Sequence, residues 1–167
     1  MMKFQILKKY LFNCFLLTIP ILLWDYIFTD RLPKAFQPEI FWKDIPPYIT
    51  NVENISRLIM FVFISLMPLK IKTTTQKKGF ALYATGTLLY FASWLMLIYF
   101  PNSIWSKSVL GLLSPAYTPL LWLIGIGLIG DSLFFNIPYK RWLYFLVVII
   151  FLLFHNWHTY LIYFRTH

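Results

Sequence analysis

Residues 142–164 read WLYFLVVIIFLLFHNWHTYLIYF and contain no Asp, Glu, Lys or Arg. As a helix, this stretch spans about 34 Å, and the hydrocarbon core of a bilayer is about 30 Å thick. Residues 79–100 and 108–130 are equally free of charged side chains. These three segments predict transmembrane helices and set the fold class as all-α.

The composition of the whole chain agrees with a membrane protein. Of its 167 residues, 59% are hydrophobic and only 13% are charged, and the mean hydropathy is +0.66. A soluble domain usually carries about 25% charged residues. The composition therefore excludes the water-soluble, disordered, collagen-like and coiled-coil classes. The single cysteine, Cys14, excludes an intrachain disulfide framework and a cysteine-based zinc site.

Two further segments are expected to cross the bilayer. Residues 10–28 are apolar except for Asp25 near the end, and they are expected to be a retained first helix rather than a signal peptide. Residues 52–71 contain Arg57, and only residues 58–69 are continuously free of charge. This second segment crosses only if its flanking basic side chains snorkel to the head groups; a re-entrant segment is the alternative.

The distribution of charge favours five spans with the N-terminus inside and the C-terminus outside. In that topology nine basic residues lie on the cytoplasmic side and six outside, as the positive-inside rule requires. The inner set is Lys3, Lys8, Lys9, Lys70, Lys72, Lys77, Lys78, Lys140 and Arg141. If the second segment did not cross, the bias would reverse. The sequence therefore predicts a polytopic transmembrane helix bundle with five spans, N-in/C-out.

The whole chain, residues 1–167, is expected to form a single membrane domain. Its predicted spans are 10–28, 52–71, 79–100, 108–130 and 142–164. Residues 29–51 form the predicted outer loop, whose prolines break regular helix and whose aromatic side chains suit the membrane interface. A short helical turn is expected near residues 38–43. The net charge of +9 is scattered at the span ends, so no nucleic-acid partner is expected.

Small residues line spans 3 and 4. Residues 125–130 read GIGLIG, which matches a dinucleotide-binding fingerprint in letters, but the segment ends an apolar span and no acidic residue follows Asp131. Close helix packing explains these glycines better, and Pro115 and Pro119 are expected to kink the same helix. The partners expected are the lipid bilayer and, through these small-residue faces, a membrane protein or a second copy of the chain.

Ionisable and polar side chains within the spans are the candidate functional residues, because such groups are costly in a membrane. In the predicted topology they converge on the outer leaflet and predict a polar ligand-binding cavity there. The set is Asp25, Glu53, Arg57, Tyr117, Thr118, His155 and His158. Glu53 and Arg57 have the i,i+4 spacing of an ion pair, and Asp25 alternatively marks the end of its helix. His155 and His158 are i,i+3 neighbours that either form interhelical hydrogen bonds or bind a metal.

Three functions are compatible with these features. The first is a small non-catalytic accessory or ligand- or lipid-binding protein with a polar cavity in the outer leaflet. The second is an intramembrane enzyme that binds a metal or haem through His155 and His158. The third is a small-solute transporter that works as an oligomer. The first is favoured because no catalytic motif accompanies the spans. The composition favours a bacterial inner membrane as the location.

Overall fold

The computed structural model describes residues 11–135 and 138–166, and within these ranges the chain is helical, without a β-strand. In chain order, the elements begin with η1 (Cys14–Leu17), α2 (Ile19–Phe28), η2 (Thr29–Arg31), η3 (Lys34–Phe36), α3 (Pro38–Phe41), α4 (Pro47–Leu66) and α5 (Thr74–Tyr99). They are followed by α6 (Ile104–Lys107), α7 (Val109–Leu112), α8 (Ser114–Tyr117), α9 (Pro119–Ile129) and α10 (Arg141–Thr166).

Three of these helices, α4, α5 and α10, are long and apolar enough to cross a membrane. The all-α class predicted from the sequence is confirmed, and the three long helices are compatible with the membrane-protein class that the charge-free stretches predict. Segments 14–28 and 109–129 also run along the long axis of the molecule, but each is broken into shorter helices.

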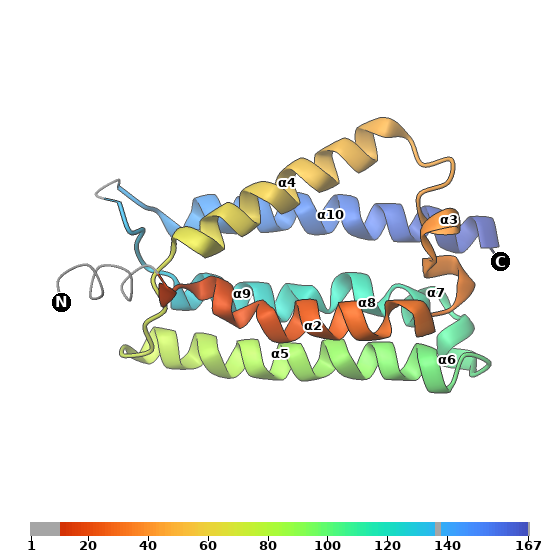
Figure 1. Ribbon diagram of the computed structural model, residues 1–167, viewed down its shortest axis with the longest axis horizontal. Coiled ribbons are helices and arrows are strands. Elements are labelled where there is room, and N and C mark those ends of the chain that lie inside the picture. Colours follow the sequence, from red (N-terminus) through yellow and green to blue (C-terminus); the bar gives the residue numbers. More distant parts are fainter. Residues whose placement is uncertain (1–10, 136–137, 167) are drawn as a thin grey trace.

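Two helix pairs make up most of the bundle. Helices α5 and α9 lie side by side, as do α4 and α10, and α2 lies near α9 and α5 (Figure 1). Residues 67–73, 130–135 and 138–140 lie at one end of the bundle, which we call the hairpin end. Residues 29–46, α6 and the end of α10 lie at the opposite end, which we call the loop end.

Helix α4 begins and ends about five residues earlier than the predicted span 52–71. Pro47 lies in its first turn, where the missing N–H costs no intrahelical bond. The helix ends before Pro68, and Met67 has extended backbone with ψ 121°, as expected for a residue that precedes proline. Helix α4 therefore gains its length from the polar residues of its first turns, and the basic residues after Leu66 lie outside it.

The predicted fourth span is divided at its prolines. Pro115 opens α8 and Pro119 opens α9, since a proline inside a helix removes an i→i−4 hydrogen bond. The carbonyl of Gly111, which Pro115 cannot serve, accepts a hydrogen bond from Ser114 Oγ at 2.6 Å. The hydroxyl thus satisfies a polar group that would otherwise be buried without a partner.

Glycines bring α5 and α9 into backbone contact. A Cβ atom on Gly86 would lie 2.5 Å from the backbone nitrogen of Trp122, and one on Gly125 would lie 2.5 Å from the backbone nitrogen of Tyr83. Gly79 faces Gly125 in the same contact. The glycines of the two small-residue faces therefore pack against each other within the chain. Ala81 and Thr85 stay on the exposed side of α5, and the predicted contact with a partner through these spans stays a prediction.

We expect Gly86→Val to destabilise the bundle, because its side chain would force the α5 and α9 backbones apart. Overpacking of this kind costs about 1–3 kcal/mol. Ala81→Val, on the exposed face of the same helix, is the matched control. Cys14 is fully buried and is the single cysteine of the chain, so its rate of thiol modification during heating in detergent reports unfolding. Equal midpoints for the two variants would contradict the close contact.

Candidate functional site

The Glu53 carboxylate is the most deeply buried acidic group among the residues that the structure describes, with a side-chain exposure of 0%. A buried carboxylate is stable only when hydrogen-bond donors surround it. Three side chains supply them. Arg57, one turn along α4, donates to Oε1, and the Nδ1 atoms of His155 and His158 lie 3.0 Å from Oε1 and 2.7 Å from Oε2. The i,i+4 ion pair predicted from the sequence is therefore part of a larger cluster.

Helix α10 presents the two histidines on the same face because they are three residues apart. His158 is completely buried, and its Nε2 donates to the backbone carbonyl of Phe41 in α3 at 2.9 Å. The rings of Phe41 and Trp42 pack against the imidazole, with centroid distances of 4.3 and 5.0 Å. His158 therefore connects the loop end of the bundle to the buried carboxylate on α4.

Hydrogen-bond directions fix the charge of this cluster. The Phe41 carbonyl can only accept, so His158 Nε2 carries a proton. One further proton lies in the hydrogen bond between His158 Nδ1 and Glu53 Oε2. Whichever of these two atoms carries it, His158 and Glu53 together have no net charge. Arg57 is always protonated. With His155 either neutral or cationic, the cluster carries a net charge of at least +1.

Arg57 and His155 carry this positive charge to the edge of a cavity. The Arg57 side chain is 33% exposed and that of His155 is 19% exposed. The ring of Phe151 stacks on His155 at a centroid distance of 5.3 Å and receives the guanidinium of Arg57 at 5.4 Å. This packing holds both cationic side chains in place, since each has an aromatic face beside it.

The opposite wall of the cavity contains Asp25. The Tyr90 hydroxyl donates to Asp25 Oδ1 at 2.7 Å, and the Thr29 hydroxyl donates to the Asp25 backbone carbonyl at 2.5 Å. Trp94 and Trp122 lie beside them, and the indole N–H of Trp122 is buried with no hydrogen-bond partner in the described part of the chain. Buried donors without acceptors are rare, because each costs the full desolvation of the group.

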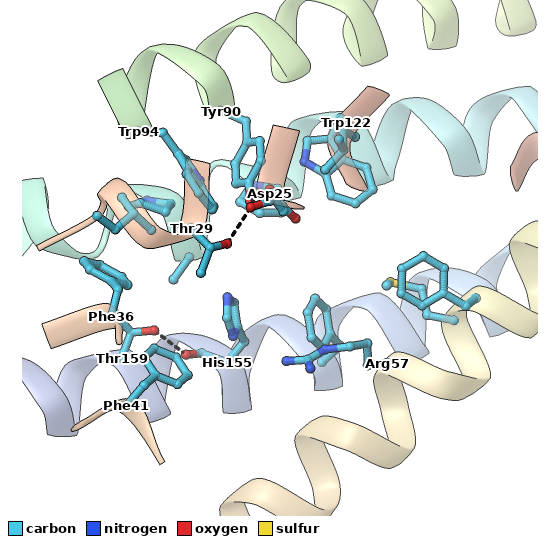
Figure 2. A pocket seen from close by; sticks show the side chains of 18 residues that line it. Asp25, Thr29, Phe36, Phe41, Arg57, Tyr90, Trp94, Trp122, His155 and Thr159 are labelled. Atoms are coloured by element: carbon cyan, nitrogen blue, oxygen red, sulfur yellow. Dashed lines mark hydrogen bonds between the residues drawn. The ribbon is translucent and has the colours of Figure 1, made fainter. Parts of the chain in front are cut away.

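Figure 2 shows the two walls facing each other, with Arg57 and His155 on one side and Asp25, Tyr90 and Trp122 on the other. The cavity between them has a volume of about 330 Å³. Apolar side chains complete its lining, from α2, α4, α8, α10 and the loop end. No ion pair joins Asp25 to a basic group within residues 11–135 and 138–166. The two charged walls are therefore separated by the cavity.

The structure brings together only some of the predicted site residues. Asp25, Arg57 and His155 line the cavity, whereas Glu53 and His158 lie behind its wall. Tyr117 and Thr118 line a second hollow of about 530 Å³, mostly apolar, between α5 and segments α8 and α9. Sequence reasoning did not single out three aromatic lining residues, namely Tyr90, Trp94 and Trp122. The i,i+4 spacing of Tyr90 and Trp94 was visible, but aromatic pairs are common in apolar helices.

The histidines are not arranged as a metal site in this structure. Both Nδ1 atoms contact Glu53, and His158 Nε2 contacts a carbonyl, so no free nitrogen of His158 remains. No group of three metal-ligating side chains that could hold an ion occurs among the described residues. The contact with Glu53 uses only Nδ1 of His155, so its Nε2 remains for a ligand in the cavity. Glu53 orients the His155 ring in the way that the aspartate of a catalytic triad orients its histidine. The hydroxyl of Thr159, one turn along α10, donates to the backbone carbonyl of His155 at 2.9 Å rather than to the His155 ring.

Comparisons with known proteins add no assignment: no protein-family model, curated protein or solved structure matches the chain.

We expect Glu53→Gln to destabilise the protein strongly, because Arg57 loses its counter-ion and His158 loses a charged partner. Removing one member of a buried ion pair costs about 3–5 kcal/mol, and the partial exposure of Arg57 places this case near the lower limit. The exposed Glu39→Gln is the matched control. The double variant Glu53→Gln/Arg57→Gln should recover part of the loss. The unfolding midpoints of these variants are measured from the modification of Cys14 during heating. A wild-type midpoint for Glu53→Gln would contradict the stabilising role assigned to the Glu53 carboxylate.

Proposed function

We propose that the chain is a multi-pass integral protein of a cell membrane, a bacterial inner membrane, and that it binds a small ligand without catalysing a reaction. The cavity between Asp25 and Arg57 carries this proposal. Its volume of about 330 Å³ lies at the lower end of the range for small-molecule sites, about 300–1,000 Å³. Its mixture of apolar walls and a few converging polar groups is also typical of such sites.

The proposed topology has five spans, with the hairpin end in the cytoplasm and the loop end outside. Two observations support it. The segments 14–28 and 109–129 run beside the three long helices, so the chain alternates between the two ends of the bundle. Lys70, Lys72 and Arg141 lie near the hairpin end, as expected for a cytoplasmic face. In this topology the cavity, which borders the loop end through Leu32 and Phe36, would lie in the outer half of the membrane.

Labelling from outside intact cells tests this topology. On a Cys14→Ser background, Asp44→Cys and Lys107→Cys should react with a membrane-impermeant maleimide, because both residues lie at the loop end. Lys77→Cys should react only after the cells are opened. All three positions lie outside the buried core. Labelling of Lys77→Cys and Lys107→Cys from the same side would contradict the five-span arrangement.

Native mass spectrometry of the purified protein tests ligand binding. We expect the wild type, gently extracted from its membrane, to retain a small bound molecule. Ala116 lines the cavity, so Ala116→Phe should abolish this adduct by filling the space. Ala81→Phe, on the exposed face of α5, should keep it. Protection of Cys14 shows that each variant is folded. An absent adduct in the wild type, or an equal adduct in folded Ala116→Phe, would overturn the proposal.

A further inference from the structure

The two walls of the cavity have opposite charge and do not meet. The wall formed by α4 and α10 carries a net charge of at least +1, which it presents through Arg57 and His155. The wall formed by α2 and α5 presents the Asp25 carboxylate. Because no basic side chain of the described residues pairs with Asp25, each wall leaves a charge that a ligand can neutralise.

The hydrogen bonding of Asp25 agrees with this distribution of charge. Asp25 takes one side-chain hydrogen bond, from Tyr90 to Oδ1, and its Oδ2 receives none from the described residues. A ligand that donates hydrogen bonds and carries positive charge would complete the hydrogen bonding of this carboxylate and balance its charge. The cavity therefore calls for a cationic hydrogen-bond donor beside Asp25.

Aromatic rings stand next to the carboxylate. Tyr90 and Trp94 pack with ring centroids 5.7 Å apart, and both line the cavity with Trp122. Carboxylates combined with aromatic rings recognise ammonium groups, which interact with the ring faces. Arg57 and His155 on the other wall suit an oxyanion, since hydrogen bonds between a guanidinium and an oxyanion are strengthened by charge.

We infer that the cavity binds a zwitterion, with its ammonium group at Asp25 and its oxyanion at Arg57 and His155. This inference rests on the proposed ligand-binding function and names its ligand class. A volume of about 330 Å³ accommodates a small zwitterion or a lipid headgroup, and leaves no room for two acyl chains as well.

Binding of defined probes to the full chain in detergent tests the inference. The zwitterionic probes are a short-chain phosphatidylethanolamine, free phosphoethanolamine and leucine, and the anionic probe is a short-chain phosphatidylglycerol of equal chain length. Calorimetry gives each dissociation constant. We expect at least one zwitterionic probe to bind at least tenfold more tightly than phosphatidylglycerol. Preference for phosphatidylethanolamine identifies a lipid headgroup as the source, and equal or tighter binding of a free zwitterion identifies a soluble ligand.

Two variants separate the ends of the ligand. Asp25→Asn should weaken binding of the zwitterion at least tenfold and leave phosphatidylglycerol binding unchanged or tighter. Arg57→Gln should weaken both. Asp30→Asn, an exposed acid five residues further along, is the control and should behave as the wild type. Cys14 protection confirms that the variants are folded, and for an unfolded Arg57→Gln the double variant Glu53→Gln/Arg57→Gln replaces it.

The outcomes distinguish this inference from the proposed function. If phosphatidylglycerol binds as tightly as every zwitterion, or if folded Asp25→Asn keeps the wild-type preference, the zwitterion assignment is wrong while a ligand site remains. The same holds if no probe binds but the wild type still retains an adduct that Ala116→Phe loses. If no probe binds and no adduct is present, both proposals fail.

Discussion

The buried carboxylate of Glu53 is the interaction on which the rest of the structure depends. It lies on α4 with no access to solvent and is held by donors from α4 and α10. His158 extends the same network to the Phe41 carbonyl, so α3 is joined to the two helices. Loss of any donor would leave charge unpaired at a dry site, which is why these three elements are expected to hold together as a unit.

The positive wall of the cavity follows from this arrangement. One carboxylate balances one positive charge, yet it is surrounded by an arginine and two imidazoles, so an excess of positive charge remains near Arg57 and His155. Asp25 lies too far away to balance it. The α5–α9 pair, with its closely packed glycines, holds Tyr90, Trp94 and Trp122 on the facing side. The cavity is thus the space between two internally well-packed helix pairs.

Local sequence patterns predicted part of this arrangement. Uncharged stretches coincide with the long helices α5 and α10, and the spacing of Glu53 and Arg57 and of His155 and His158 predicted which side chains share a face. The sequence placed both pairs in the outer leaflet, but their direct contact depends on α4 lying beside α10, which local patterns do not give. The contact with Phe41 uses a backbone carbonyl, which leaves no mark in the side-chain sequence.

Other placements were missed for identifiable physical reasons. Tyr117 and Thr118 were assigned to the cavity only because they lie in the outer half of the predicted fourth span, but they line the second hollow instead. The register of α4 was predicted from the absence of charge, whereas Pro47 and Pro68 determine its limits. Trp94 and Trp122 became candidates only when the structure placed them in the lining of the cavity.

A short backbone pairing at the hairpin end has a mechanical consequence. Cys14 donates its N–H to the Met67 carbonyl at 2.8 Å, and Leu69 donates its N–H to the Phe12 carbonyl at 3.0 Å. These two bonds pin the start of the first segment to the end of α4. Residues 29–46 join the same two helices at the loop end, so α2 and α4 are tied to each other at both ends. Asp25 and Arg57 lie between these two ties, which therefore limit how far the opposite charges can move apart.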